Sequence, residues 1–179
     1  GPDTSFWNVD QRLRPNIGRV SPRATLPVRD TITLKSITAY RGLEDDPSPW
    51  DQDATPLQTY GWTQYIDQRQ FSQEVQALGD FGSLNFVLGV SFFRERLDFI
   101  RNTFTNNAYS LIDSHIIDRS LGVYGQATYD LTDKLSVTAG LRFNKEWQRF
   151  DNASYTSNAA NDRIALRYSV AGLKDDWNA

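Results

Sequence analysis

Residues Arg119–Glu146, RSLGVYGQATYDLTDKLSVTAGLRFNKE, decide the fold because they form two alternating runs separated by a turn sequence. Successive side chains of a β-strand point to opposite faces, so each run predicts a strand with one apolar face and one polar or small face. Thr132-Asp133 between the runs is typical of a turn, because both side chains hydrogen-bond their own backbone. The stretch therefore predicts an antiparallel hairpin. The expected apolar faces carry Leu121, Val123, Gly125, Ala127 and Tyr129 in the first run and Leu135, Val137, Ala139, Leu141 and Phe143 in the second.

The same alternation recurs along the chain and predicts further strands, while residues 1–18 show no period and are expected to form a loop. No stretch has the period of an amphipathic helix, and no Gly-rich phosphate motif stands between a strand and a helix. The fold class is therefore predicted to be all-β, an antiparallel up-and-down meander. The further strands cover 31–41, 68–78, 83–95 and about 164–170, with a weaker candidate over 19–26 that Pro22 and Pro27 interrupt.

The connections between these strands alternate in length. Those near 27–30, 79–82 and 130–134 are short, whereas those near 42–67, 96–118 and 147–162 are long. In a meander, alternate connections emerge at opposite ends of the sheet, so all the long ones share one end. Outer-membrane β-barrels have this asymmetry, with short periplasmic turns and longer extracellular loops. The pattern predicts part of a large transmembrane β-barrel with three long extracellular loops.

Aromatic residues on the expected apolar faces lie near the strand ends. Tyr40, Phe71, Phe92 and Phe143 fall near the long-loop end, and Tyr129 falls near the short-turn end. An aromatic girdle at each membrane interface has this placement, because the ring body enters lipid and its edge tolerates headgroups.

Composition excludes several classes of protein. The 179 residues are 39% hydrophobic, and no segment approaches the roughly 18 apolar residues of a transmembrane helix. Transmembrane β-strands need only about 9–11 alternating residues and are not excluded. A net charge of -3 argues against nucleic-acid binding. The absence of cysteine excludes disulfides and thiolate chemistry, and a single histidine argues against a histidine-based catalytic or metal centre.

Five segments resemble strands of TonB-dependent outer-membrane receptors and come in that family's order. They are Leu34–Arg41 (LKSITAYR), Phe71–Gln76 (FSQEVQ), Leu84–Val90 (LNFVLGV), Val123–Tyr129 (VYGQATY) and Leu135–Arg142 (LSVTAGLR). Together they span most of residues 31–149, which makes the resemblance specific although each segment alone is weak.

The resemblance implies a barrel of about 22 strands that is filled by an N-terminal plug, with an energy-coupling box before the plug. Residues 1–179 offer six or seven candidate strands and no plug, box or C-terminal aromatic strand, so they are expected to be an internal slice of the barrel. The implied function is active uptake of a scarce nutrient, such as a siderophore, a cobalamin or a glycan, without a cofactor. The implied partners are outer-membrane lipid of a Gram-negative bacterium, the remainder of the barrel, and the TonB energy-coupling complex through the plug.

Two other functions remain open at this point. The same strands would serve a passive porin or a structural outer-membrane protein with a water-filled lumen. A soluble carbohydrate-binding β-sandwich also has alternating strands, and its apolar face would meet a second sheet instead of lipid. Burial of Leu88, Val123 and Leu141 in a dry protein interior would favour the sandwich.

The 42–67 connection carries the candidate ligand-binding residues Trp50, Tyr60, Trp62 and Tyr65. Loop aromatics provide large contact areas at low entropic cost, so these four are predicted to stack on a ligand at the outer mouth, with packing between loops as the alternative. No catalytic residue is assigned, because nothing fixes the separation of any acidic pair.

Other charged groups receive structural interpretations. An acidic set in the 42–67 connection has oxygen ligands suited to Ca²⁺, but its spacing does not match an EF-hand, so a solvated loop is expected and no metal site is predicted. A second set is predicted to face the lumen, where it would contact the plug or water, and His115 is expected to be exposed in a loop. The acidic set is Glu44, Asp45, Asp46, Asp51 and Asp53, and the lumen set is Lys35, Arg41, Glu74, Arg142 and Glu146.

Overall fold

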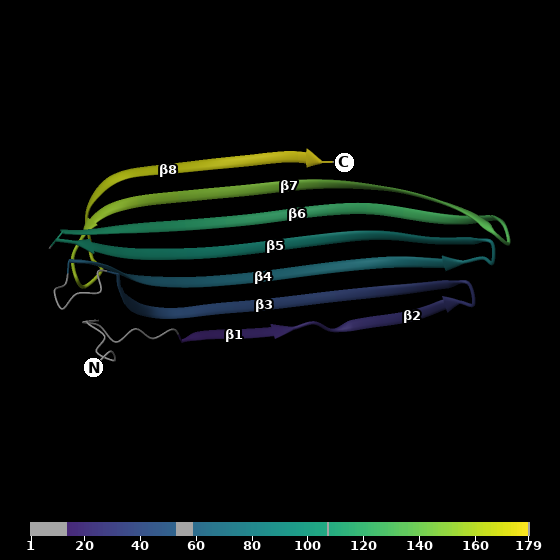
Figure 1. Ribbon diagram of the computed structural model, residues 1–179, viewed down its shortest axis with the longest axis horizontal. Coiled ribbons are helices and arrows are strands. Elements are labelled where there is room, and N and C mark those ends of the chain that lie inside the picture. The colour runs from purple at the N-terminus through teal and green to yellow at the C-terminus, as the bar shows by residue number, and fades with distance from the viewer. Residues whose placement is uncertain (1–13, 53–58, 107, 179) are drawn as a thin grey trace, which may run out of the picture.

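The computed structural model describes residues 14–52, 59–106 and 108–178. These residues form eight strands in one antiparallel sheet, with the order β1-β3-β4-β5-β6-β7-β8 and with β2 also paired to β3 (Figure 1). The described ranges contain no helix long and apolar enough to cross a membrane. The strands are β1 Pro15–Val20, β2 Arg23–Arg29, β3 Ile32–Asp51, β4 Tyr60–Asp80, β5 Leu84–Thr105, β6 Ala108–Thr132, β7 Leu135–Ser157 and β8 Arg163–Asn178.

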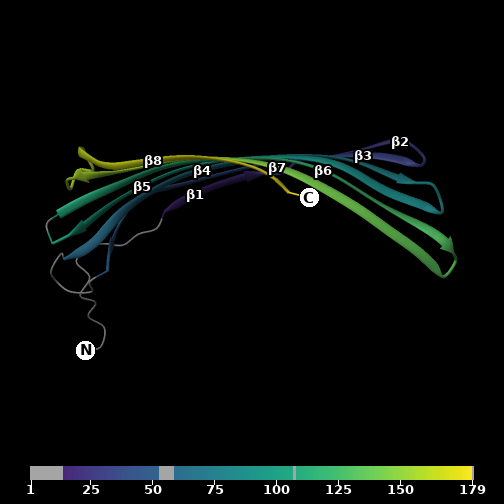
Figure 2. The same cartoon turned by 90° about the horizontal axis from the view of Figure 1, so that it is seen from above.

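The sheet is a single curved layer, which Figure 2 shows as an arch. The β2–β3, β4–β5 and β6–β7 turns lie at one end, and the β3–β4, β5–β6 and β7–β8 connections lie at the other (Figure 1). The up-and-down meander predicted from the sequence is therefore confirmed, and the connections predicted to be short and those predicted to be long lie at opposite ends of the sheet.

The predicted hairpin is also confirmed, because β6 and β7 pair with Val123 opposite Phe143 and Gly125 opposite Leu141. The apolar positions of successive strands fall on one face, which is called the apolar face here; the other is the polar face. One row across five strands reads Leu34, Ala77, Leu88, Gly125 and Leu141.

No second layer covers the apolar face within the described residues. Leu88 is 54% exposed, Val123 is 49% exposed and Leu141 is 73% exposed. The described residues therefore form one sheet and do not include the second sheet that a β-sandwich packs against its apolar face. Leu111 is the one buried hydrophobic residue in the described part of the chain, so the sheet builds almost no core of its own.

The height of the apolar face fits a lipid bilayer. From Val137 to Trp147, β7 rises about 33 Å along its axis, at about 3.3 Å per residue. With a strand tilt of roughly 40°, this length spans about 25 Å, the height of the apolar band of outer-membrane barrels. Tyr40, Phe71 and Trp147 lie in register at the long-connection end. The prediction of a loop at Trp147 is therefore wrong.

The predicted long loops are wrong in extent, because the strands continue through most of them. Residues 42–51 belong to β3 and 60–67 to β4, while 53–58 lie outside the described residues. The predicted loop 96–118 is strand over 96–105 and 108–118, with Asn106 in a turn and residue 107 outside the described residues, and 147–162 is strand as far as Ser157. Beyond the apolar band both faces meet water, so the apolar–polar alternation disappears while backbone pairing continues.

The ends of the sheet hold two further corrections. Residues 15–18, expected in a loop, are part of β1, and the rest of that predicted loop, apart from Arg14, lies outside the described residues. The single strand expected over 19–26 is two strands that pair with different parts of β3. The break falls at Ser21-Pro22, where the Pro22 carbonyl accepts a hydrogen bond from the Thr38 N–H at 3.1 Å.

The last strand is irregular in a way that its alternation did not predict. Leu166 pairs with Tyr155 and Tyr168 pairs with Ser154, with a register shift between them. Tyr155 and Ser154 are adjacent in β7, so Leu166 and Tyr168 do not share a face as expected.

Candidate functional site

Three of the four predicted ligand-binding residues meet at the end of the β3–β4 hairpin. Trp50 pairs directly with Trp62 across the two strands. Their rings are stacked with centroids 6.3 Å apart and an interplanar angle of 16°. Tyr60 meets Trp62 edge-on at 6.1 Å and 70°. Such aromatic pairs contribute about 0.5–1.5 kcal/mol each beyond the area that they bury, so the cluster orders this end of the hairpin.

Arg101 joins the cluster from β5 and was not predicted. Its guanidinium carbon lies 5.3 Å from the Trp62 ring centroid and 5.1 Å from that of Phe99. Arg101 Nη2 donates a hydrogen bond to Gln64 Oε1 at 2.7 Å. Its Nε is buried and has no hydrogen-bond partner within the described residues. The sequence does not reveal Arg101, because its segment lacks alternation and predicts a loop, whereas the register places Arg101 opposite Gln64.

Tyr65 lies apart from the other three residues. It is three positions after Trp62 in β4, and odd and even positions of a strand point to opposite faces. Burial, followed by the negative charges of Asp67 and Glu44, raises the pKa of the Tyr65 hydroxyl. The structure therefore separates Tyr65 from the aromatic cluster, which we define as Trp50, Tyr60, Trp62 and Arg101.

The acidic residues of the same hairpin do not converge. Glu44 and Asp45 are adjacent in β3 and face Asp67 and Ile66 of β4, while Asp51 faces Gly61. Among the described residues no group of three or more carboxylates and histidines could hold a metal ion. Asp53 lies outside the described residues, as does the side chain of Asp46.

His115 is exposed but lies in β6 and not in a loop. Its Nδ1 lies 2.6 Å from Asp98 Oδ1, and its Nε2 lies 3.3 Å from Asp113 Oδ1. Burial raises the pKa of Asp98, but hydrogen bonds from His115 and Arg96 and their charges outweigh it, so the net pKa is lowered. This group ties β5 to β6 beyond the apolar band.

The polar face holds a hydrogen-bonded network across three strands. Tyr124 Oη donates to Glu74 Oε1 at 2.5 Å. Gln76 Nε2 donates to the same Glu74 oxygen and to Tyr124 Oη, both at 3.0 Å. The Arg142 guanidinium lies 5.7 Å from the Tyr124 ring centroid. β5 lies between Glu74 of β4 and Tyr124 of β6. It leaves room for the Tyr124 side chain to reach Glu74, because Gly89 has no side chain and a Cβ there would overlap the Tyr124 ring.

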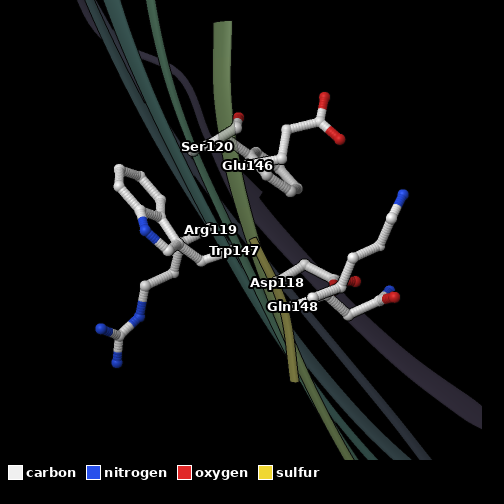
Figure 3. A pocket seen from close by; sticks show the side chains of 8 residues that line it. Asp118, Arg119, Ser120, Glu146, Trp147 and Gln148 are labelled. Carbon is white, nitrogen blue, oxygen red and sulfur yellow. The ribbon is translucent and has the colours of Figure 1, made fainter. Parts of the chain in front are cut away.

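The network brings together two of the five predicted lumen residues, Glu74 and Arg142. Lys35 and Arg41 lie on β3, opposite Gln76 and Gln70 respectively. Glu146 lines a separate hollow of about 340 Å³. Figure 3 shows Glu146, Ser120 and Asp118 on one side of the sheet at this hollow, with Arg119 and Trp147 on the other side.

Comparison with known proteins assigns the fold and the family. The TonB dependent receptor-like, beta-barrel family model matches residues 3–179. The ferric yersiniabactin uptake receptor FyuA from Yersinia pestis has a similar crystal structure, with a TM-score of 0.79 at 13% sequence identity. The match covers 98% of this chain and 28% of FyuA, so the chain spans a little over a quarter of that receptor. A search of curated proteins found no match.

The structural likeness shows the barrel fold, and the family match covers nearly the whole chain. The described residues provide the matching architecture, a single antiparallel meander with an uncovered apolar face. The family consists of receptors and not of enzymes. This chain therefore belongs to the TonB-dependent receptor-like β-barrel family.

Proposed function

We propose that this chain is a segment of the barrel wall of a TonB-dependent receptor that takes up a scarce nutrient across the outer membrane of a Gram-negative bacterium. The observation that carries the proposal is the family match over residues 3–179. The curved sheet supports it, since its apolar face is exposed and no second layer of described residues covers it. The ligand would be siderophore-like, cobalamin-like or glycan-like.

In this proposal the aromatic cluster contacts the ligand at the outer mouth. Trp50 and Trp62 offer stacked rings beyond the membrane band, and Arg101 holds a positive charge beside Trp62. A flat or partly apolar ligand with an anionic edge would suit this surface, because the rings contribute contact area and the guanidinium contributes charge. Tyr65 is left out of the contact surface because it lies on the other face of β4.

The polar face would line the barrel lumen, where a plug domain elsewhere in the receptor would contact it. The network of Glu74, Gln76, Tyr124 and Arg142 presents hydrogen-bonding groups there. In this reading the TonB complex acts on the plug, while the chain contributes a fixed wall. The partners of this chain are then lipid on one face, the plug on the other and the remaining strands at its edges.

Uptake by the complete receptor tests the proposal. A strain that lacks the receptor gene would be complemented with wild type or with Trp62→Ala, and import of labelled ferric siderophore, cobalamin and oligosaccharide would be measured. We expect one ligand class to enter only with the wild-type receptor and only while TonB is present. The control is Tyr65→Phe, which alters an aromatic residue outside the cluster and should import normally.

The same strains separate active uptake from a passive pore. Import that continues after deletion of TonB, together with open conductance of the purified receptor in planar bilayers, would contradict the proposal and favour a porin. Normal import by the Trp62→Ala receptor would leave uptake standing and remove the aromatic cluster from ligand contact.

A further inference from the structure

The connection between β7 and β8 contains a turn that is closed by its own asparagines. Asn158 Oδ1 accepts hydrogen bonds from the N–H groups of Ala160 and Asp162, at 2.9 and 3.1 Å respectively. The Asn161 N–H donates to the Asn158 carbonyl at 3.1 Å. Asn161 has a φ of 67°, in the left-handed region that asparagine tolerates better than most residues. Residues 158–162, called the β7–β8 turn here, are therefore held in one shape by their own hydrogen bonds.

A buried side chain of β5, Asn102, holds this turn against the sheet. Figure 1 shows the connection reaching back across the ends of β6 and β5. Asn102 Nδ2 donates hydrogen bonds to the Asn158 carbonyl at 2.8 Å and to Asn161 Oδ1 at 2.7 Å. Asn102 Oδ1 accepts a hydrogen bond from Ser157 Oγ at 2.6 Å. Asn102 is 6% exposed, so its amide satisfies both of its donor hydrogens and its oxygen inside the protein.

The contacts of Asn102 enclose the one hydrophobic residue that the described part of the chain buries. Leu111 of β6 pairs with Asn102 on one side and with Tyr155 of β7 on the other, so these three side chains share a face. The hydrogen bond from Ser157 to Asn102 joins β7 to β5 past β6, and Leu111 beneath it is 1% exposed. A small packed unit, rather than an isolated hydrogen bond, therefore connects these three strands beyond the apolar band.

The β7–β8 turn also reaches β4. Thr63 Oγ1 donates a hydrogen bond at 3.4 Å to Asn161 Oδ1, the same oxygen that accepts a bond from Asn102. Thr63 and Asn102 are paired directly across β4 and β5, so their side chains point to the same face. The turn therefore spans both strands on that face and is bonded to one residue of each.

The aromatic cluster lies on the opposite face of the same two strands. Arg101 precedes Asn102 in β5, and adjacent strand residues point to opposite faces. Trp62 precedes Thr63 in β4 in the same way. Arg101 pairs with Gln64, so Arg101 and Trp62 are diagonal neighbours across the two strands. The distance of 5.3 Å between the guanidinium carbon and the ring centroid therefore depends on the twist and displacement of β4 relative to β5.

A link that spans both strands on one face limits that twist. Beyond the apolar band the described strands bury almost no apolar side chains, so little else fixes the position of β4 relative to β5 there. We propose that Asn102 is a positioning residue, which holds the β7–β8 turn across β4 and β5 and thereby sets the geometry of Arg101 against Trp62. This inference rests on the proposed function, in which the aromatic cluster contacts the ligand.

Fluorine NMR of the purified, complete receptor tests this role, because the signal of a fluorinated tryptophan shifts with the charge near its ring. The receptor would carry fluorotryptophan, and the Trp62 signal is the one that Trp62→Phe removes. Arg101→Met, which lacks the guanidinium, gives the reference position. Asn102→Leu removes three hydrogen bonds at similar volume, and Asn161→Gly removes the shared acceptor while glycine accepts the positive φ. Both variants should move the Trp62 signal toward its position in Arg101→Met.

The matched control is Asn152→Leu. Asn152 Nδ2 donates to Ser114 Oγ at 2.8 Å, a bond that joins β7 to β6 and involves neither β4 nor β5. This variant also loses an amide beyond the apolar band, and it should leave the Trp62 signal in place. An equal shift in Asn152→Leu would indicate a general effect of a lost amide and overturn the proposal. An unchanged signal in Asn102→Leu or in Asn161→Gly would overturn it as well, because Asn102 or the turn would then be dispensable.

Ligand binding connects the positioning role to uptake. Labelled ferric siderophore, cobalamin and oligosaccharide would each be titrated against the same proteins. A probe that binds wild type should bind Asn102→Leu and Asn161→Gly about two- to fivefold more weakly, because a displaced guanidinium forfeits about one exposed cation–π contact. Asn152→Leu should bind that probe like wild type. Unchanged affinity despite a shifted Trp62 signal would contradict the ligand contact that the proposed function gives to the aromatic cluster.

Failure of the proposed function and failure of this inference give different results. If none of the three probes binds wild type, the proposed function is contradicted, and the fluorine spectra still decide whether Asn102 sets the geometry of Arg101 against Trp62. Heat-modifiable migration reports the folding of each variant. If Asn102→Leu does not fold, Asn102→Asp replaces it, because aspartate keeps the size and the acceptor for Ser157 but lacks both donor hydrogens.

Discussion

Substitution of Leu141 by arginine separates a lipid-facing sheet from one that faces water. Leu141 is 73% exposed and lies in the apolar row with Leu88. It is four residues beyond Val137, so it lies about 13 Å along β7 and about 10 Å into a band roughly 25 Å high. The side chain is therefore near the midplane. Arginine at such a position costs about 2–4 kcal/mol, whereas an exposed substitution in water changes stability by about 0.5 kcal/mol or less.

The assay is urea-induced unfolding of the full-length receptor in lipid vesicles, followed by tryptophan fluorescence. The depth control is Leu135→Arg, at the short-turn edge of the same face, for which about 0–1 kcal/mol is expected. The face control is Gln126→Arg on the polar face, which should cost little because the lumen is hydrated. If Leu141→Arg costs no more than Leu135→Arg, or if Gln126→Arg costs as much, the assignment of the apolar face to lipid is refuted.

Three further predictions concern local interactions. A double-mutant cycle between Trp50 and Trp62 should give a coupling free energy of about 0.5–1.5 kcal/mol in the unfolding of the receptor, and additive effects would mean that the stack contributes nothing. Gly89→Ala should destabilise the receptor by about 1–3 kcal/mol through overlap with Tyr124, and the same change in a Tyr124→Ala background should be nearly neutral; an equal cost in both would exclude the overlap. The lowered pKa of Asp98 stabilises the folded state above the ordinary value of 3.8, and this contribution is lost as pH falls through the lower, folded-state pKa. Asp98→Asn should therefore flatten the loss of thermal stability below about pH 4, and an unchanged acid profile would show that this carboxylate does not contribute.

The sheet and its two faces were predictable because side-chain alternation is a local property. Each apolar run between Leu84 and Phe143 places its residues on one face whatever its partner strand, and the short turns fix which strands are neighbours. Strand length was not predictable in the same way. Segments such as 96–105 and 108–118 have polar residues at both parities, and only pairing with the neighbouring strand shows that they are extended.

The residues of the candidate site were also only partly predictable from the sequence. The sequence located Trp50, Tyr60 and Trp62 because aromatic residues cluster within one short stretch. It could not separate Tyr65 from them, since a loop has no defined faces, and it could not add Arg101, which lies far along the chain and arrives through the β4–β5 register. Excluding Tyr65 from the cluster and including Arg101 both require the knowledge that the hairpins continue as paired strands beyond the apolar band.

Continuation of the strands past the membrane band has a consequence for how a ligand would be captured. Trp62 is joined to the barrel wall by an unbroken β4–β5 ladder, from Tyr60 opposite Thr105 to Asp80 opposite Asn85. A contact residue carried on such a ladder has a fixed position before the ligand arrives, so binding there would forfeit little backbone entropy. The cluster would then be a rigid contact surface that meets the ligand some distance above the cell surface. Any conformational change on ligand binding would have to occur in other parts of the receptor.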